Sequence, residues 1–150
     1  MSVIPEFDER GNLPPGIHFG EWEEFVDRFG TNALRLRLMR GLLMVMEALK
    51  AAGCRTIYIN GSFVTLKPDP GDFDACWDRE DVDIDYLRLK APKLLNHYDR
   101  AGQKAQYKGE IFPVDQPIGN YGMNSFELFQ RDRSQNKKGI IAIDLMRWNP

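Results

Sequence analysis

Histidine and cysteine are scarce in this chain, with two residues of each among 150. No partner pattern surrounds His18 or His97, so the sequence offers no Ser-His-Asp triad, and we expect both rings to serve packing or surface roles. Cys54 and Cys76 lack metal-ligand spacing and lie in apolar segments. This predicts two small buried side chains rather than a disulfide or a zinc site.

Long apolar runs and an excess of positive charge are also missing. No segment approaches the roughly 20 apolar residues that a membrane helix needs, and residues 1–6 lack the basic start and apolar core of a secretory signal. We therefore expect a cytoplasmic protein without a membrane partner. The formal net charge is −2, so an RNA substrate would need a local basic patch.

What the chain does have is enough apolar sequence for one domain with a core, at 43% hydrophobic residues. Short β-branched and apolar runs alternate with helical patterns, which predicts an α/β fold with helices packed on a β-sheet. The segments that we expect to form strands or strand-like structure are 56–60, 72–77, 106–114, 125–131 and 137–146, with a loop over 113–124.

The first 20 residues are rich in proline and show little periodicity, so we expect an extended arm packed irregularly on a domain that comprises residues 21–150. A short helix is predicted from Glu21 to Phe29. Gly30 would stop it, and Thr31 would cap the next helix.

That next helix, which Gly53 would end, has the clearest pattern in the chain. Its apolar residues should face the sheet, and most of its charged residues should face solvent. A further helix is predicted over 86–101, with an interruption at Pro92. The apolar residues expected to face the sheet are Leu34, Leu38, Leu42, Val45, Met46 and Leu49, and the charged residues expected to face solvent are Arg35, Arg37, Arg40, Glu47 and Lys50.

A Gly-Ser pair follows the predicted strand over 56–60. Gly61 permits a sharp turn and a close approach to the backbone, while Ser62 offers a hydroxyl and opens a turn whose free N–H groups can face an anion. The pair therefore suits a phosphate group.

Two aspartates follow ten residues later, after a stiff connection containing two prolines. In a strand, Asp72 and Asp74 lie on one face, and Phe73 and Ala75 lie on the other, toward the core. Two adjacent carboxylates suit Mg²⁺ at a phosphoryl-transfer site.

The segments Ile59-Asn60-Gly61-Ser62 and Asp72-Phe73-Asp74 resemble the fingerprint of the nucleotidyltransferase superfamily of the DNA polymerase β type, although Asn60 stands where an apolar residue is commoner. More widely, nearly the whole chain resembles a bacterial group of small nucleotidyltransferase-like proteins, through the Phe-Val-Thr-x-Lys insert after Ser62 and the segments 13–18, 109–114 and 138–140. The resemblance implies the nucleotidyltransferase fold, in which helices pack on a mixed β-sheet.

The resemblance also implies roles for individual residues. Gly61 and Ser62 would contact a nucleoside triphosphate, and Asp72, Asp74 and a third carboxylate would bind two Mg²⁺ ions, with Mn²⁺ as an alternative. For the third carboxylate we choose Asp144, near the end of the predicted strand over 137–146. The rivals are Asp83 and Asp85, whose position favours a turn leading into a helix.

Cations near these motifs are candidates for phosphate contacts. Lys67 is the first cation after the Gly-Ser pair, where many minimal members have an arginine sooner. A second group, Arg131, Arg133, Lys137 and Lys138, precedes the Asp144 strand and could attract a triphosphate or an RNA backbone, although a solvated hairpin loop would explain these residues equally well.

The implied function is Mg²⁺-dependent transfer of a nucleoside monophosphate from a nucleoside triphosphate to a hydroxyl of RNA or protein. Stand-alone members of the superfamily often belong to toxin–antitoxin or phage-defence pairs, so the resemblance also implies a cognate protein partner. The alternative is a non-catalytic protein of the same fold that acts by binding, as an antitoxin or a nucleotide sensor.

Overall fold

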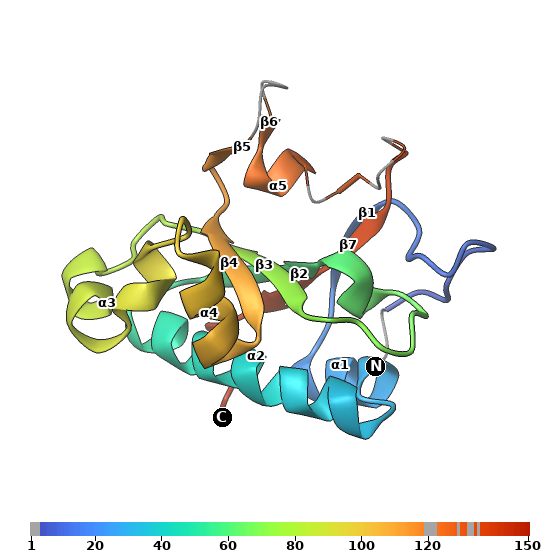
Figure 1. The fold of residues 1–150 in the computed structure, drawn as a ribbon, viewed down its shortest axis with the longest axis horizontal. Helices are drawn as coiled ribbons and strands as arrows, with labels where there is room; N and C mark the ends of the chain where they lie inside the picture. Colours follow the sequence, from blue (N-terminus) through green and yellow to red (C-terminus); the bar gives the residue numbers. More distant parts are fainter. Residues whose placement is uncertain (1–3, 119–122, 129, 132–133, 135) are drawn as a thin grey trace.

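The computed structural model describes residues 4–118, 123–128, 130–131, 134 and 136–150. A mixed five-stranded sheet with the strand order β1-β7-β2-β3-β4 forms its centre, and helices pack against it (Figure 1). The α/β class predicted from the sequence is therefore confirmed. The strands of this sheet are β1 (Gly16–Phe19), β2 (Thr56–Asn60), β3 (Phe73–Trp77), β4 (Gly109–Pro113) and β7 (Gly139–Asp144).

Strand direction alternates only around the centre of the sheet. β2 is antiparallel to both of its neighbours, β3 and β7, whereas β1 is parallel to β7 and β4 is parallel to β3. Two short strands, β5 (Pro117–Ile118) and β6 (Met123–Asn124), form a separate antiparallel pair.

Helices fill most of the connections. They are α1 (Trp22–Phe29), α2 (Ala33–Ala51), α3 (Ile84–Lys90), α4 (Arg100–Tyr107) and α5 (Ser125–Leu128), with 3₁₀ turns η1 (Gly61–Val64) and η2 (Pro92–Leu95). In the described part of the chain, none of these helices has the length and apolar character needed to cross a membrane.

The predicted apolar stripe of α2 is buried, apart from the half-buried Leu34 in the first turn. Gly30 ends α1 as expected, but the cap of α2 is Asn32 and not Thr31. The Asn32 side-chain oxygen accepts a hydrogen bond from the Arg35 backbone N–H at 2.8 Å. This contact satisfies one of the free donors of the first helical turn.

Contrary to our expectation for a charged residue of this helix, Arg35 does not face solvent. Its side chain is only 2% exposed. Its guanidinium donates to the backbone carbonyls of Phe29, Phe63, Thr65 and Lys67 and lies 5.0 Å from the Phe63 ring centroid. An arginine can be buried in this way because four carbonyls accept from its planar fork. The guanidinium thus ties η1 and the loop after it to α2.

The N-terminal arm is irregular only up to residue 15. Beyond it, β1 joins the sheet as an edge strand, in parallel register with Gly16 opposite Gly139. Ile4 and Leu13 are buried in the core, so the arm packs as part of the same hydrophobic unit as the rest of the described chain.

The region from 84 to 113 follows the predicted interruption at Pro92 but not the predicted strand start. α4 continues to Tyr107, Lys108 takes a left-handed conformation with φ of 69°, and β4 begins at Gly109. Gln103 on α4 is buried and exchanges hydrogen bonds with the backbone of Ile111 at 3.1 and 2.9 Å. This exchange covers the outer edge of β4.

The strand predicted over 125–131 is wrong over its first four residues, because these form α5, whereas Arg131 makes an antiparallel bridge with Lys137 and residue 129 lies outside the described residues. The Asn124 side chain accepts from the Glu127 backbone N–H at 2.9 Å, and the Glu127 side chain accepts from the Asn124 N–H at 3.2 Å. This reciprocal capping box stabilises a helical turn that the local apolar pattern did not reveal.

The two faces of the sheet differ in chemistry. One face is apolar and packs on the helices, through buried residues such as Ile57, Ile59 and Ala75. We call the other the open face. In Figure 1 it lies on the side of β5, β6 and α5, and it carries Tyr58, whose ring centroid lies 4.8 Å from that of Phe126. Polar and charged residues gather on the open face at one end of the sheet.

Candidate functional site

The Gly-Ser turn meets the second aspartate of the Asp-x-Asp pair. Asn60, the last residue of β2, pairs with Asp74 on β3. Gly61 follows with φ of +81°, and a Cβ atom at this position would lie 2.4 Å from the Asp74 carboxylate oxygen Oδ2. Only glycine permits this conformation and this approach without displacing the carboxylate. The close approach predicted for Gly61 is thus an approach to Asp74.

Asp72 precedes β3 and Asp74 lies within it, two residues further on. Phe73 and Ala75 are fully buried on the apolar face, as the period of two predicts. Asp72 and Asp74 therefore lie on the open face and interact electrostatically.

A third carboxylate, which we did not select from the sequence, joins them. Glu110 on β4 is directly opposite Asp74 in the parallel β3–β4 register and is only 8% exposed. Opposite residues of paired strands share a face. The sequence signal for Glu110 was a single acid within the segment that we expected to form a strand, directly before Ile111. The structure therefore brings Asp72, Asp74 and Glu110 together.

Burial and the neighbouring acids change the ionisation of Asp74. The pKa of Asp74 is raised to about 7, first by burial and then by the negative charges of Asp72 and Glu110, while Lys138 and Lys104 oppose the shift. Loss of the Asp74 proton would add negative charge to a cluster that is already negative and poorly solvated. A cation bound beside Asp74 would therefore be favourable.

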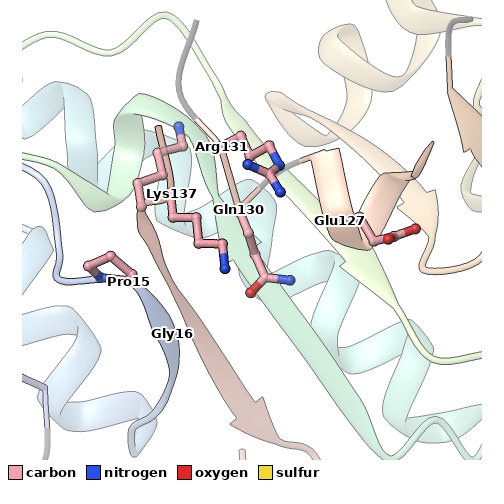
Figure 2. A pocket seen from close by; sticks show the side chains of 7 residues that line it. Pro15, Gly16, Glu127, Gln130, Arg131 and Lys137 are labelled. Atoms are coloured by element: carbon pink, nitrogen blue, oxygen red, sulfur yellow. The ribbon is translucent and has the colours of Figure 1, made fainter. Parts of the chain in front are cut away.

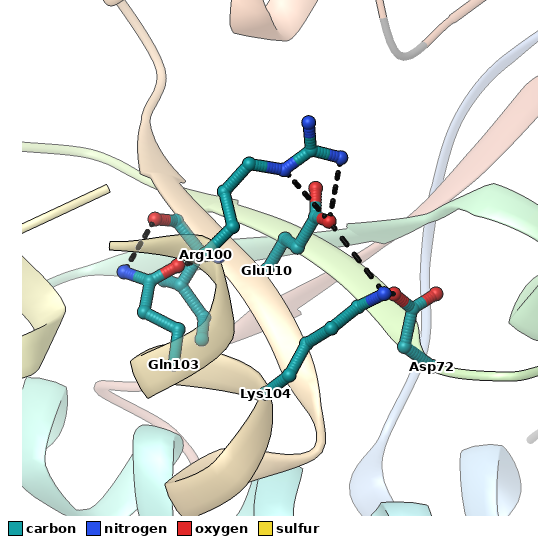
Figure 3. A network of polar contacts seen from close by, with 6 residues as sticks. Asp72, Arg100, Gln103, Lys104 and Glu110 are labelled. Carbon is teal, nitrogen blue, oxygen red and sulfur yellow. Dashed lines mark hydrogen bonds and ion pairs between the residues drawn. The ribbon is translucent and has the colours of Figure 1, made fainter. Parts of the chain in front are cut away.

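Two cations of α4 already contact these acids (Figure 3). The Arg100 guanidinium donates to Glu110 Oε1 at 3.0 and 2.8 Å. Lys104 Nζ lies 3.0 Å from Asp72 Oδ2 and 3.9 Å from Glu110 Oε1. Arg100 and Lys104 are four residues apart, so one face of α4 presents both charges. The hydrogen bond that Lys104 donates to Asp72 raises the pKa of Lys104.

Asp144 is not brought to this cluster. It lies on β7 opposite Thr56, at the start of β2, whereas Asp74 lies opposite Asn60 at its end. Four residues of β-strand separate the two levels by about 13 Å along the strand. The Asp144 side chain accepts from the Met146 backbone N–H at 2.9 Å. Asp144 shares the open face but occupies the opposite end of the sheet.

The rival acids Asp83 and Asp85 belong to α3. Asp83 is its N-cap and accepts from the Tyr86 backbone N–H at 3.0 Å, and Asp85 pairs with Arg88 at 2.6 Å. As expected, they lead into a helix.

Ser62 lies in the first turn of η1, directly after Gly61, and its carbonyl accepts from the Thr65 hydroxyl at 2.6 Å. The side chain of Lys67 is exposed. Its carbonyl is held by Arg35, and the next carbonyl, that of Pro68, accepts from Asn32 at 2.7 Å. These contacts tie the Lys67 loop to the start of α2 and not to the carboxylates.

Asn60 is fully buried, yet neither polar atom of its side chain has a hydrogen-bond partner among the described residues. An unsatisfied buried amide costs about 1–3 kcal/mol for each lost bond. Asn60 shares the open face with Asp74 through their pairing. A retained cost of this kind at a candidate site indicates a ligand or a water that completes the bonding.

Beside this site lies a cavity of about 510 Å³ between β1, α5 and the residues that precede β7 (Figure 2). Its lining residues are Pro15, Gly16, Glu127, Gln130, Arg131, Lys137 and Lys138. Three of them, Arg131, Lys137 and Lys138, belong to the group of four cations noted in the sequence. The fourth, Arg133, lies outside the described residues.

Within the part of the chain that the structure describes, no three His, Cys, Asp or Glu side chains are already grouped as a metal site. The Lys104 amine contacts both Asp72 and Glu110, as Figure 3 shows. The donor set nevertheless suits a hard cation, because it consists of carboxylate oxygens on one face of a rigid sheet.

The arrangement defines a class of site: a buried acidic cluster at the end of a mixed sheet, in contact with a glycine turn and flanked by a cationic cavity. The chain belongs to the family described as a family of unknown function (DUF6932), which it matches over residues 5–144. No curated protein and no solved structure gives a significant match.

Proposed function

We propose that this protein is a metal-dependent nucleotidyltransferase that moves a nucleoside monophosphate from a nucleoside triphosphate to a hydroxyl of RNA or protein. The observation that carries the proposal is the direct contact between the Gly61 backbone and the Asp74 carboxylate, on the sheet face that also carries Asp72 and Glu110. It unites a phosphate-binding turn with a cation-binding cluster.

In this proposal Asp72, Asp74 and Glu110 hold Mg²⁺ or Mn²⁺, so Glu110 replaces Asp144 as the third carboxylate. A bound divalent cation supplies charge stabilisation to the reacting phosphate and favours ionisation of the acceptor hydroxyl. Lys104 and Arg100 then turn from the carboxylates toward phosphate oxygens, which have the same charge and suit the same donors.

The backbone of Gly61 and the hydroxyl of Ser62 orient the triphosphate. The acceptor oxygen forms a bond to the α-phosphorus as the bond from that phosphorus to the β-phosphate oxygen breaks. Pyrophosphate leaves with the electron pair of that bond, and the hydroxyl proton passes to solvent. The acceptor class and a cognate toxin or antitoxin partner are supported only by the resemblance of the motifs around Gly61 and Asp74.

One observation favours the non-catalytic alternative. Arg100 and Lys104 already neutralise Glu110 and Asp72, so the acidic cluster is balanced without a metal. In that case the acids and the α4 cations would form a structural ion-pair network under a nucleotide-binding or protein-binding surface.

The test is transfer of label from the four α-³²P nucleoside triphosphates onto cellular RNA and protein, with Mg²⁺ or Mn²⁺. We expect Asp72→Asn/Asp74→Asn and Glu110→Gln each to reduce transfer by at least 100-fold, while Asp144→Asn stays within about threefold of the native protein. Asp144→Asn is the matched control because it neutralises an acid on the same face at the other end of the sheet.

Loss of transfer in Asp144→Asn with retention in Glu110→Gln would contradict the assignment of Glu110. If no acceptor is labelled, Mn²⁺ binding measured by electron paramagnetic resonance separates the two functions. Native binding that Glu110→Gln abolishes supports the metal site without its acceptor, whereas absence of binding in the native protein supports the non-catalytic alternative.

A further inference from the structure

The cavity lies at the same end of the sheet as the acidic cluster. The β2–β7 ladder pairs Ile59 with Ile141, so β7 begins where β2 gives way to Gly61. η1 contacts β7, and the charge of Lys138 lowers the pKa of Asp74 against the effect of burial. The cavity and the acids are therefore neighbours on either side of the Gly-Ser turn.

Strand order arranges the charges in a row. Lys138 precedes β7, Asn60 ends β2, Asp74 lies on β3 and Glu110 lies on β4, in the spatial order of the sheet. The unsatisfied Asn60 amide stands in this row between the cationic side and the acidic side. A ligand that spans the row needs negative charge at the cavity, and Asp74 and Glu110 would hold a divalent cation that offsets the negative charge at its other end.

Among the described residues, the lining of the cavity is cationic, with Arg131, Lys137 and Lys138 against one acid, Glu127, and with Gln130 as a neutral donor. Figure 2 shows the side chains of Arg131, Lys137 and Gln130 close to one another among the residues that line this cavity. At −2 the whole chain has no comparable positive excess. The positive charge is therefore local to a concave site.

The backbone around the cavity is firmly connected. Lys138 N–H donates to the Gln130 carbonyl at 2.8 Å, and Arg131 and Lys137 form an antiparallel bridge. Directly after Lys138, Gly139 packs against the arm so tightly that a Cβ atom there would lie 2.1 Å from the Pro14 carbonyl oxygen. These contacts hold the backbone that carries the cations before any ligand binds, which reduces the entropy cost of binding.

We propose that this cavity binds the β- and γ-phosphates of the nucleoside triphosphate, and then the pyrophosphate product. This proposal rests on the proposed function, since it assigns the tail of the same substrate. A volume of about 510 Å³ is typical of small-molecule sites. A compact polyanion suits three cations around a cavity, whereas an RNA backbone needs an extended basic groove.

The assignment also orients the reaction. With the polyphosphate tail on the β7 side and the α-phosphate above Asp74, the acceptor hydroxyl approaches from the side of Glu110 and α4. In-line displacement requires the acceptor and the leaving pyrophosphate to lie on opposite sides of the reacting phosphorus. The row of charges meets this requirement.

The experiment is isothermal titration calorimetry of the full chain with inorganic tripolyphosphate, in EDTA at fixed ionic strength. We expect Lys137→Gln/Lys138→Gln to weaken binding at least tenfold. The matched control, Arg37→Gln/Arg40→Gln, removes the same charge from exposed positions on α2 and should change binding by less than twofold. Circular dichroism checks that all variants fold.

Unchanged affinity in Lys137→Gln/Lys138→Gln, or no binding of tripolyphosphate by the native protein, would overturn the assignment. So would binding of a single-stranded RNA that depends on these lysines and that tripolyphosphate fails to displace. The Asp72→Asn/Asp74→Asn variant separates the two proposals: it should lose nucleotide transfer but keep tripolyphosphate binding, because no metal is present in this assay.

Discussion

Asn60 combines complete burial with a polar side chain that has no described partner. Replacement by leucine, of similar size, removes the cost of the unsatisfied amide. We expect Asn60→Leu to raise the free energy of unfolding by about 1–3 kcal/mol without ligand, and to reduce nucleotide transfer at least tenfold if the amide serves the substrate. Urea denaturation and the label-transfer assay measure the two effects. A destabilised Asn60→Leu would mean that the amide is already satisfied within the fold.

Asp74 predicts a pH dependence of stability. Its pKa is raised from 3.8 to about 7 in the folded protein, so the folded state holds this proton more tightly than the unfolded state. The stability that the proton contributes is complete below pH 3.8 and is lost as the pH rises to about 7. A full proton corresponds to about 1.4 kcal/mol per pH unit.

Urea denaturation in EDTA between pH 4.5 and 8 tests this dependence. The native protein should lose more stability over that range than Asp74→Asn, which cannot titrate. Asp144→Asn serves as the control and should keep the native slope, since it lies at the far end of the sheet. Parallel slopes in the native protein and Asp74→Asn would show that Asp74 titrates normally.

At the scale of elements, Arg35 links α2 to the loop that follows the Gly-Ser turn. Lysine keeps the charge but cannot donate to four carbonyls from one planar group. We expect Arg35→Lys to destabilise the protein by about 1–3 kcal/mol and to increase amide hydrogen exchange in residues 61–67 more than elsewhere.

Hydrogen exchange with mass spectrometry measures the Arg35→Lys effect peptide by peptide. Arg37→Lys is the control, because Arg37 is exposed on the same helix and its replacement should leave exchange unchanged. An increase in exchange that is the same across the whole chain of Arg35→Lys would indicate global destabilisation. Arg35 would then have no particular role in holding residues 61–67.

The sequence was most informative about features that a single strand or turn determines. The period of two assigned Asp74 and Phe73 to opposite faces, and the glycine turn followed from Gly61 alone. It was less informative where elements meet. Asp144 and Glu110 both occupy strands, and only the register of β7 and β4 against their neighbours decides which one reaches Asp74. Arg35 shows the same limit, since its burial depends on carbonyls up to 32 residues away.

For the whole molecule, the two faces of the sheet have different roles: the apolar face holds the core, and the open face carries the acidic cluster at one end. Metal binding should therefore stabilise the fold through the acidic cluster alone. We expect 5 mM Mn²⁺ to raise the melting temperature of the native protein and of Asp144→Asn, because a ligand that binds only the folded state stabilises it in proportion to RT ln(1 + [L]/Kd).

Glu110→Gln and Asp72→Asn/Asp74→Asn should show no such rise, and their melting temperatures without metal should be compared first, since each also changes the ion pairs with Arg100 and Lys104. Below pH 7, binding should release a proton from Asp74, because a metal-bound carboxylate is ionised. Calorimetry in buffers of different ionisation enthalpy measures this release. Stabilisation of all variants alike would place the metal elsewhere and leave the cluster as an ion-pair network between α4 and the sheet.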